Sequence, residues 1–285
     1  SYCATKEPDR EFRDMIRALH KAGIECIMEM YFPKGTPSLQ MIRSLWFWKL
    51  YYHVDGFHLL GDGVQQDVIE RDPILYGTKK LFSNVSGEAD AENMLAEYNA
   101  GFMLDMRRFL KSDEGMISGA EFHVRRNTGN FGTVNYMAAQ DGFTLYDTVS
   151  YNYRHNEANG EDNRDGSEFN YSWNCGVEGS TRKTAVRRMR EQQMRNAFLM
   201  LLLSQGTPMI YGGDEFANSQ AGNNNVWCQD NPTGWTDWKN ARRHTGLSSF
   251  VKEAIAFRKN HPILHMPKEM RGVDYMAKGF PDVSV

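Results

Sequence analysis

A regular alternation of helix-like and strand-like segments is the feature that most constrains the fold of this chain. Apolar residues recur at helical spacing over 12–19, and the apolar segment 24–30 that follows predicts a strand. The same order returns downstream, with a helical pattern over 41–52 and a strand-like segment over 53–60. Strands that alternate with helices at this spacing indicate parallel βαβ units, so we predict an α/β fold.

The alternation continues toward the carboxyl terminus. We predict, in chain order, a strand over 79–83, a helix over 103–110, a strand over 134–139, a helix over 186–204 and a strand over 208–211. The long helix over 186–204 carries four arginines that we expect on its solvated side, because charges along a helix usually face water: Arg187, Arg188, Arg190 and Arg195.

Two polar segments between these elements predict long loops. Residues 157–179 and 217–231 are dense in Asn, Asp, Gly and Ser, whose side chains compete with regular backbone pairing. Long ordered loops in compact domains usually carry function, and in a (β/α)8 barrel the loops that follow strands build the active face. Both segments follow predicted strands, so we expect them near a functional site.

Composition limits the classes of function. With 41% hydrophobic and 24% charged residues, the chain holds enough apolar material for one large core, and we expect a single domain over 1–285. A net charge of −3 gives no globally basic surface for nucleic acid or anionic lipid. The longest apolar run, 197–203, is far shorter than the ~20 residues that cross a bilayer. Neither nucleic acid nor a membrane is therefore an expected partner.

The cysteines favour neither a metal centre nor a disulfide framework. Cys3, Cys26, Cys175 and Cys228 are widely spaced and form no CxxC or Cys/His cluster. We therefore expect no metal and no other cofactor. Unpaired thiols favour a reducing compartment, so we expect a cytoplasmic location.

A series of ordered motifs in the second half of the chain resembles one family. The motifs are QDGFTL (140–145), VSYN (149–152), HNEANG (155–160), SWNCGVEG (172–179), LLSQGTPM (202–209), GGDEF (212–216), GNNN (222–225) and CQDN (228–231). Together they are similar to the isoamylase and glycogen-debranching branch of the α-amylase superfamily, glycoside hydrolase family 13. The resemblance covers nearly the whole chain.

The resemblance implies a (β/α)8 TIM barrel and a retaining hydrolase that cuts α-1,6 branch points of glycogen or starch-derived dextrins. Such chemistry requires a carboxylate nucleophile and a carboxylic acid about 5–5.5 Å apart. The match begins with the helix before the third barrel strand, so we expect the barrel in this chain to lack its first two strands. The open strand edges would then need either an upstream segment or another chain as a partner.

Two catalytic positions depart from the family pattern. The fourth-strand motif reads GFHLL (56–60), which places Leu60 at the nucleophile position and His58 at the position of an arginine. A leucine side chain has no lone pair with which to attack the anomeric carbon. At the fifth strand the general acid aligns with Ser83, whose hydroxyl is far too weak an acid to protonate a leaving oxygen near neutral pH.

Other positions of the site include both replaced and retained family residues. In the third-strand motif Glu29 replaces an aspartate, and Pro33 and Lys34 replace an Asn-His pair. At the seventh strand Gln140 replaces a histidine, but the third carboxylate of the family is retained as Asp141. A loop-entry aspartate that accepts backbone hydrogen bonds is an equally acceptable interpretation of Asp141.

Further side chains are candidates for substrate binding. Besides His58 and Gln140, they are Trp173, Asp214 and Glu215, which belong to the downstream motifs. A tryptophan ring can stack on the apolar face of a sugar, although core packing accounts for such a residue equally well.

Three hypotheses about function remain open. The first is a catalytically degenerate homologue that keeps α-glucan binding or an assembly role. The second is an active α-glucosidic hydrolase with displaced carboxylates, Asp62 and Glu88; on an extended strand Asp62 would lie roughly 6–7 Å beyond Leu60. The third is an incomplete or decaying product without a carbohydrate role. Because family motifs end three strands there, we expect Leu60, Ser83 and Asp141 to converge at the carboxyl ends of the strands.

Overall fold

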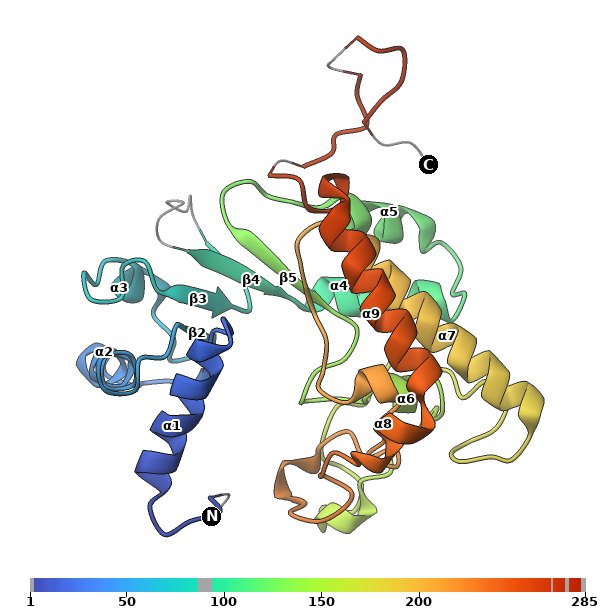
Figure 1. Ribbon diagram of the computed structural model, residues 1–285, viewed down its shortest axis with the longest axis horizontal. Helices are drawn as coiled ribbons and strands as arrows, with labels where there is room; N and C mark the ends of the chain where they lie inside the picture. The colour runs from blue at the N-terminus through green and yellow to red at the C-terminus, as the bar shows by residue number, and fades with distance from the viewer. Residues whose placement is uncertain (1–2, 87–93, 268, 275–276, 283–285) are drawn as a thin grey trace. The chain divides into compact units, whose positions relative to one another are not determined.

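The computed structural model, drawn in Figure 1, describes residues 3–86, 94–267, 269–274 and 277–282. The chain forms two compact units. The first unit comprises Ser1–Tyr98 and Asn130–Thr133, and the second comprises Asn99–Gly129 and Val134–Val285. Each unit has its own hydrophobic core.

The first unit is built from parallel strands joined by helices. Its strands are β1 (Ile27–Tyr31), β2 (Gly56–Leu60), β3 (Lys79–Phe82) and β4 (Leu95–Asn99). They pair in chain order, β1 with β2, β2 with β3 and β3 with β4. Its helices are α1 (Pro8–Lys21), α2 (Ser38–Phe47), continued by a π-helical turn (Trp48–Tyr52), and α3 (Gln66–Glu70). Parallel neighbours need crossover connections, and α2 and α3 lie in the connections on either side of β2.

Apolar side chains fill the first core. Phe57 and Leu59 of β2 are buried, and they share one cluster with side chains of α2 and α3 such as Met41, Leu45 and Ile69. Successive side chains of a strand point to opposite faces, so His58 and Leu60 lie on the face opposite Phe57 and Leu59. That opposite face carries the candidate site.

The second unit combines a strand pair with most of the helices. β5 (Gly132–Tyr136), whose first residues belong to the first unit, pairs in parallel with β6 (Thr207–Met209). The helices are α4 (Ala100–Leu110), α5 (Ile117–Arg125), α6 (Leu145–Thr148), α7 (Thr184–Leu203), α8 (Lys239–Arg243) and α9 (Thr245–Asn260). Single 3-10 turns occur at Glu157–Asn159, Asp214–Phe216, Val226–Cys228 and Pro262–His265. α7 and α9 pack side by side (Figure 1).

The structure confirms the predicted α/β class, with parallel strands that alternate with helices. The boundaries differ in places. The strand predicted over 24–30 begins only at Ile27, because the Ile24 N–H still donates to a carbonyl in the last turn of α1. The sequence pattern does not reveal β4, α5 or α9. In the portions of the chain that the structure describes, no helix combines the length and apolar character needed to span a membrane.

Candidate functional site

The two replaced catalytic positions lie at neighbouring strand ends of the first unit. Leu60 is the last residue of β2, and Leu59 pairs with Phe82, the last residue of β3. Leu60 and Ser83 each follow a member of that pair, so they occupy the same level of adjacent parallel strands. Leu60 is partly buried and Ser83 is exposed. The strand ends therefore present a methyl-bearing side chain and a small hydroxyl.

His58 lies two residues before Leu60 on the same face of β2. It is 7% exposed, and its Nδ1 lies 3.0 Å from Oε2 of Glu29, its register partner on β1. The imidazole packs on the ring of Tyr98, with centroids 4.1 Å apart. Among the described residues, Nε2 of His58 has no hydrogen-bond partner. This nitrogen is itself buried from solvent, so a binding role for His58 stays a prediction.

The turn after β2 directs Asp62 away from the strand. Gly61 has φ of +96°, which L side chains rarely adopt, and its carbonyl accepts from the Val64 N–H at 3.1 Å. The Gly63 N–H donates to Phe32 at 2.9 Å, so the turn folds back along the end of β1. Asp62 is exposed in this turn instead of continuing the face that Leu60 occupies. The other displaced carboxylate, Glu88, lies outside the described residues.

The retained carboxylate, Asp141, belongs to the second unit. Gln140 and Asp141 follow β5 and are both exposed. Burial raises the pKa of Tyr136, the last residue of β5, to about 12, and the negative charge of Asp141 adds to this rise. Asp141 therefore lies electrostatically close to the end of its strand. Its convergence with Leu60 and Ser83 of the first unit stays a prediction.

Asp214, a predicted binding residue, is buried behind the surface. Its Oδ1 accepts a hydrogen bond from the Leu145 N–H at 2.9 Å, which anchors α6 to the turn after β6. Desolvation raises its pKa to about 8, against the lowering effects of that hydrogen bond and of the buried Arg107. Glu215 accepts from the Gly213 N–H at 3.0 Å, whereas the Trp173 side chain is 36% exposed. Binding roles for these residues stay predictions. The burial of Asp214 does not favour a binding role for this residue.

A pH-dependent stability follows from the buried Asp214 carboxyl. Its pKa is raised above the ordinary value of 3.8, so the folded chain keeps a proton that the unfolded chain has released. Stability must therefore fall as pH rises between these two values. Asp214→Asn cannot titrate but keeps an acceptor for the Leu145 N–H. Between about pH 5 and about pH 8 its free energy of unfolding should therefore fall by about 3 kcal/mol less than that of the natural protein.

Urea unfolding at several pH values measures this difference. Asp62→Asn, which removes an exposed carboxylate instead of a buried one, is the matched control for the substitution itself. Identical slopes for Asp214→Asn and the natural protein would show that Asp214 is ionised in the fold, contrary to this account.

Two buried polar residues that the sequence does not single out hold loops of the second unit in place. Arg107 of α4 donates to the carbonyl oxygens of Met137 at 2.6 Å and Asn170 at 3.0 Å. Asp147 of α6 accepts from Ser219 Oγ at 2.5 Å and from the Gln220 N–H at 2.8 Å, and burial raises its pKa to about 6. No cluster of three or more His, Cys, Asp or Glu side chains within the described ranges is suited to a metal ion.

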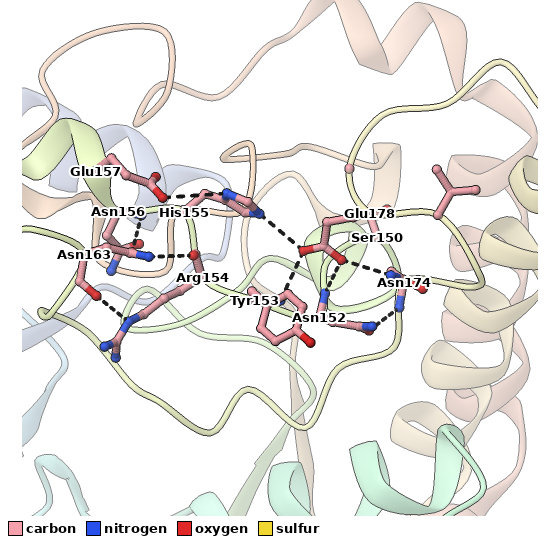
Figure 2. Close-up of polar contacts among 12 residues, drawn as sticks. Ser150, Asn152, Tyr153, Arg154, His155, Asn156, Glu157, Asn163, Asn174 and Glu178 are labelled. Carbon is pink, nitrogen blue, oxygen red and sulfur yellow. Dashed lines mark hydrogen bonds and ion pairs between the residues drawn. The ribbon is translucent and has the colours of Figure 1, made fainter.

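Glu178 organises the loop that precedes α7. Its carboxylate accepts from the N–H groups of Asn152 at 2.8 Å and Tyr153 at 3.1 Å. It also accepts from Asn174 Nδ2 at 2.9 Å and lies 3.2 Å from Nε2 of His155, as Figure 2 shows. Partial burial raises the pKa of Glu178, but these hydrogen bonds outweigh it, and the net pKa is lowered. The carboxylate therefore acts as the acceptor that holds this loop in one conformation.

The two long loops predicted from the sequence are joined to each other by side-chain amides. Asn156 Nδ2 donates to Asn224 Oδ1 at 2.8 Å, and the Asn224 N–H donates back to Asn156 Oδ1 at 3.0 Å. Asp165 Oδ2 accepts from both Asn159 and Asn225 at 2.7 Å. The loops therefore form one hydrogen-bonded layer over the second unit, and they are ordered instead of being independent flexible segments.

The expected solvation of the arginines on α7 is wrong for Arg190, which is 1% exposed. Its guanidinium donates to the carbonyl oxygens of Gly179 at 2.7 Å, Asn174 at 3.0 Å and Ser150 at 3.4 Å, and to that of Val177. Burial is tolerated because these carbonyls replace water as partners of the charged group. Arg190 therefore clamps the Glu178 loop to α7.

Curated relatives of this chain are named as a glycogen debranching enzyme and as isoamylases. It is 30% identical to a glycogen debranching enzyme of Dickeya chrysanthemi over 96% of this chain and 52% of that protein. It is 39% identical to the chloroplastic isoamylase 1 of Arabidopsis thaliana over 67% of this chain and 26% of that protein. No family model matches the chain.

The solved structures that it resembles include a pullulanase from Paenibacillus barengoltzii in complex with maltohexaose and α-cyclodextrin. The TM-score is 0.63 at 18% identity, over 90% of this chain and 47% of that one. This likeness shows the fold, in which the strands and helices of the chain correspond to part of a pullulanase. The chain spans about half the length of the curated relatives that it matches over most of its own length.

Proposed function

Since the chain belongs to the isoamylase and glycogen-debranching branch of the α-amylase superfamily, we propose that it binds α-glucan without hydrolysing it. In this proposal residues 1–285 form part of one α-amylase-type barrel domain. The observation that carries the proposal is the occupation of two adjacent strand ends by Leu60 and Ser83. A retaining glycosidase needs a nucleophile and an acid at such positions, and these two side chains supply neither.

The alternative of an active hydrolase with displaced carboxylates is less well supported. Asp62 is exposed in a turn that bends away at Gly61, so it does not extend the face of β2 on which Leu60 lies. A second carboxylate would also have to lie about 5–5.5 Å from it across the sugar. Glu88 is the remaining candidate for that role, and the geometry of the described strand ends gives it no support.

Retained binding is supported by features that do not depend on the catalytic pair. Trp173 exposes ring surface on which a glucose unit can stack. The loops that carry Trp173 are cross-linked by Glu178 and Arg190, so little ordering entropy would be lost on binding. The Paenibacillus pullulanase was solved with maltohexaose. We propose linear and branched maltooligosaccharides as the ligands of this chain.

Calorimetric titration of the purified protein with maltohexaose and with a branched dextrin tests this proposal. We expect saturable binding below millimolar ligand, and Trp173→Ala should weaken it by roughly 3- to 10-fold through the loss of stacking. Phe257→Ala, which removes an exposed ring on α9, is the matched control and should bind normally. Cellohexaose, with β-1,4 linkages, should not compete.

Absence of heat at millimolar maltohexaose and branched dextrin would contradict the binding proposal. It would instead favour the hypothesis of a product without a carbohydrate role. Equal weakening by Trp173→Ala and Phe257→Ala would remove Trp173 from the binding surface.

A further inference from the structure

A basic pocket lies in the second unit, in loops and helices that the proposed function does not use. It has a volume of about 450 Å³ and is lined by the first half of α7, by the junction of α8 and α9, and by Tyr146 of α6. In Figure 1 α8 leads directly into α9, which runs beside α7. The volume falls within the range of small-molecule sites, so the pocket can hold an organic group as well as a single ion.

Positive charge is concentrated on the lining of this pocket. Four arginines line it, Arg187, Arg188, Arg190 and Arg243, against Glu191 as the single acidic residue. Glu191 is already paired with Arg195, at 2.7 Å. The chain as a whole carries a net charge of −3, so this concentration is not a consequence of overall composition.

Three of these arginines keep most of their guanidinium donors, and the Nη1 of one of them, Arg243, donates to Asn240 Oδ1 at 3.5 Å. The Arg190 guanidinium is engaged with backbone carbonyls, but Arg187, Arg188 and Arg243 are exposed and form no ion pair with any residue that the structure describes. Arg187 and Arg243 both lie close to His244 at the α8–α9 junction. Burial lowers the pKa of His244, and the charges of these two arginines lower it further, against the raising effect of Glu191. The charges of Arg187, from α7, and of Arg243, from α8, therefore both act on His244.

The backbone adds to the same electrostatic preference. α9 has 16 residues and no side-chain N-cap, and its first turn contributes Gly246 and Leu247 to the lining. The Leu247 N–H donates to the His244 carbonyl oxygen at 3.1 Å, so Gly246 is the backbone donor of this turn that matters for an anion. α7 also lacks a side-chain cap, and its first residue, Thr184, lines the pocket. Uncapped helix N-termini present N–H groups and positive dipole ends to an anion. Guanidinium groups match the oxygens of a phosphate in paired hydrogen bonds.

We propose that this pocket is a binding site for a phosphate dianion, either inorganic phosphate or the phosphate group of a small sugar monoester. Arg187 and Arg243 hold the phosphate from two sides, and the Gly246 N–H in the first turn of α9 supplies a backbone donor. Tyr146 offers a ring beside which the organic part of a monoester lies. None of the lining residues is proposed to contact glucan, and Arg190 enters the α-glucan proposal only because it holds the loop that carries Trp173.

Titration calorimetry with inorganic phosphate and with a hexose monophosphate tests the site, and uncharged hexose serves as the ligand control. We expect saturable binding of at least one phosphate-bearing ligand, and no binding of the hexose. Arg187→Ala and Arg243→Ala should each weaken the affinity by more than about 10-fold, the effect of losing one charge-assisted contact. Tighter binding of the monoester than of inorganic phosphate would identify the monoester as the ligand, and the reverse would identify the free ion.

Two neighbouring arginines provide matched controls for charge. Arg182 and Arg242 are exposed, do not line the pocket and carry the same charge, so Arg182→Ala and Arg242→Ala should leave the affinity within about twofold. Circular dichroism checks that all four variants are folded. The site is refuted if the natural protein binds neither phosphate ligand, or if the control variants weaken binding as much as Arg187→Ala and Arg243→Ala. Maltohexaose titrations of the same variants should be unchanged, which separates this site from the glucan proposal.

Discussion

Replacing Arg190 by alanine should lower the free energy of unfolding by about 3–5 kcal/mol, the range seen when one partner of a buried charged network is removed. The Arg190 side chain is 1% exposed and donates to four backbone carbonyl oxygens between Ser150 and Gly179. Alanine would leave these carbonyls without their donor and would open a cavity behind the loop. The loop that holds Glu178 and His155 would then lose its attachment to α7.

Urea denaturation of Arg190→Ala beside Arg187→Ala measures this effect. Arg187 lies one helical turn earlier and is exposed, so its replacement should change stability by less than about 0.5 kcal/mol. Arg190→Lys keeps the charge but offers fewer donors, and it should fall between the natural protein and Arg190→Ala. Equal stability of Arg190→Ala and Arg187→Ala would mean that the carbonyl clamp does not stabilise the fold.

The burial of Arg190 was readable from the sequence, although charge alone points the other way. Met194, Ala197 and Leu201 lie four, seven and eleven residues after Arg190, which places it on the apolar stripe of α7. All three are buried. For Arg190, the position on the apolar stripe of the helix therefore predicts burial better than the charge predicts exposure, provided that nearby loops can supply carbonyl acceptors. That supply is a tertiary property which the sequence pattern does not contain.

Strand order and type were more predictable than the geometry of the strand ends. Strand β2 is largely apolar and is followed directly by a glycine, so both the existence of the strand and its carboxyl end follow from local sequence. The bend at Gly61 that turns Asp62 aside depends on contacts with Phe32, the residue that follows the neighbouring strand β1. The pairing of His58 with Glu29 likewise depends on the register of β1 and β2. Such cross-strand relations require the fold and cannot be read along one segment.

Strand β4, unlike β2, could not be predicted from its local sequence. Its five residues include the polar Glu97 and Asn99, and α4 follows without a loop, so neither alternation nor a turn signal marks the strand. Asn99 is the N-cap of α4, accepting from the Phe102 N–H at 3.1 Å, and its Nδ2 donates to Asn135 of β5 at 2.8 Å. A residue that serves a strand, a cap and a cross-strand bond carries no single local signature.

Hydrolysis of α-1,6 and α-1,4 glucosidic bonds should be absent from the natural protein, at least roughly 10⁴-fold below the rate of a complete retaining site, because both halves of the double displacement lack their group. Leu60 cannot form the glycosyl-enzyme bond, and Ser83 cannot protonate the leaving oxygen. Restoring either one alone should have little effect, because residues of a catalytic unit act together. Even the hydrolysis rate of Leu60→Asp combined with Ser83→Glu should stay far below that of a complete site, since His58 and Glu29 give the strand face a shape that differs from the family pattern.

The most direct test of this account is reducing-end release from amylopectin and pullulan by the natural protein, purified by two independent routes. An isoamylase and a pullulanase serve as positive controls, and Asp62→Asn and Glu88→Gln are assayed in parallel. The account predicts background release from the natural protein and no change in either variant. Turnover that survives the second purification and is abolished by Asp62→Asn or Glu88→Gln would contradict it and establish a hydrolase with displaced carboxylates.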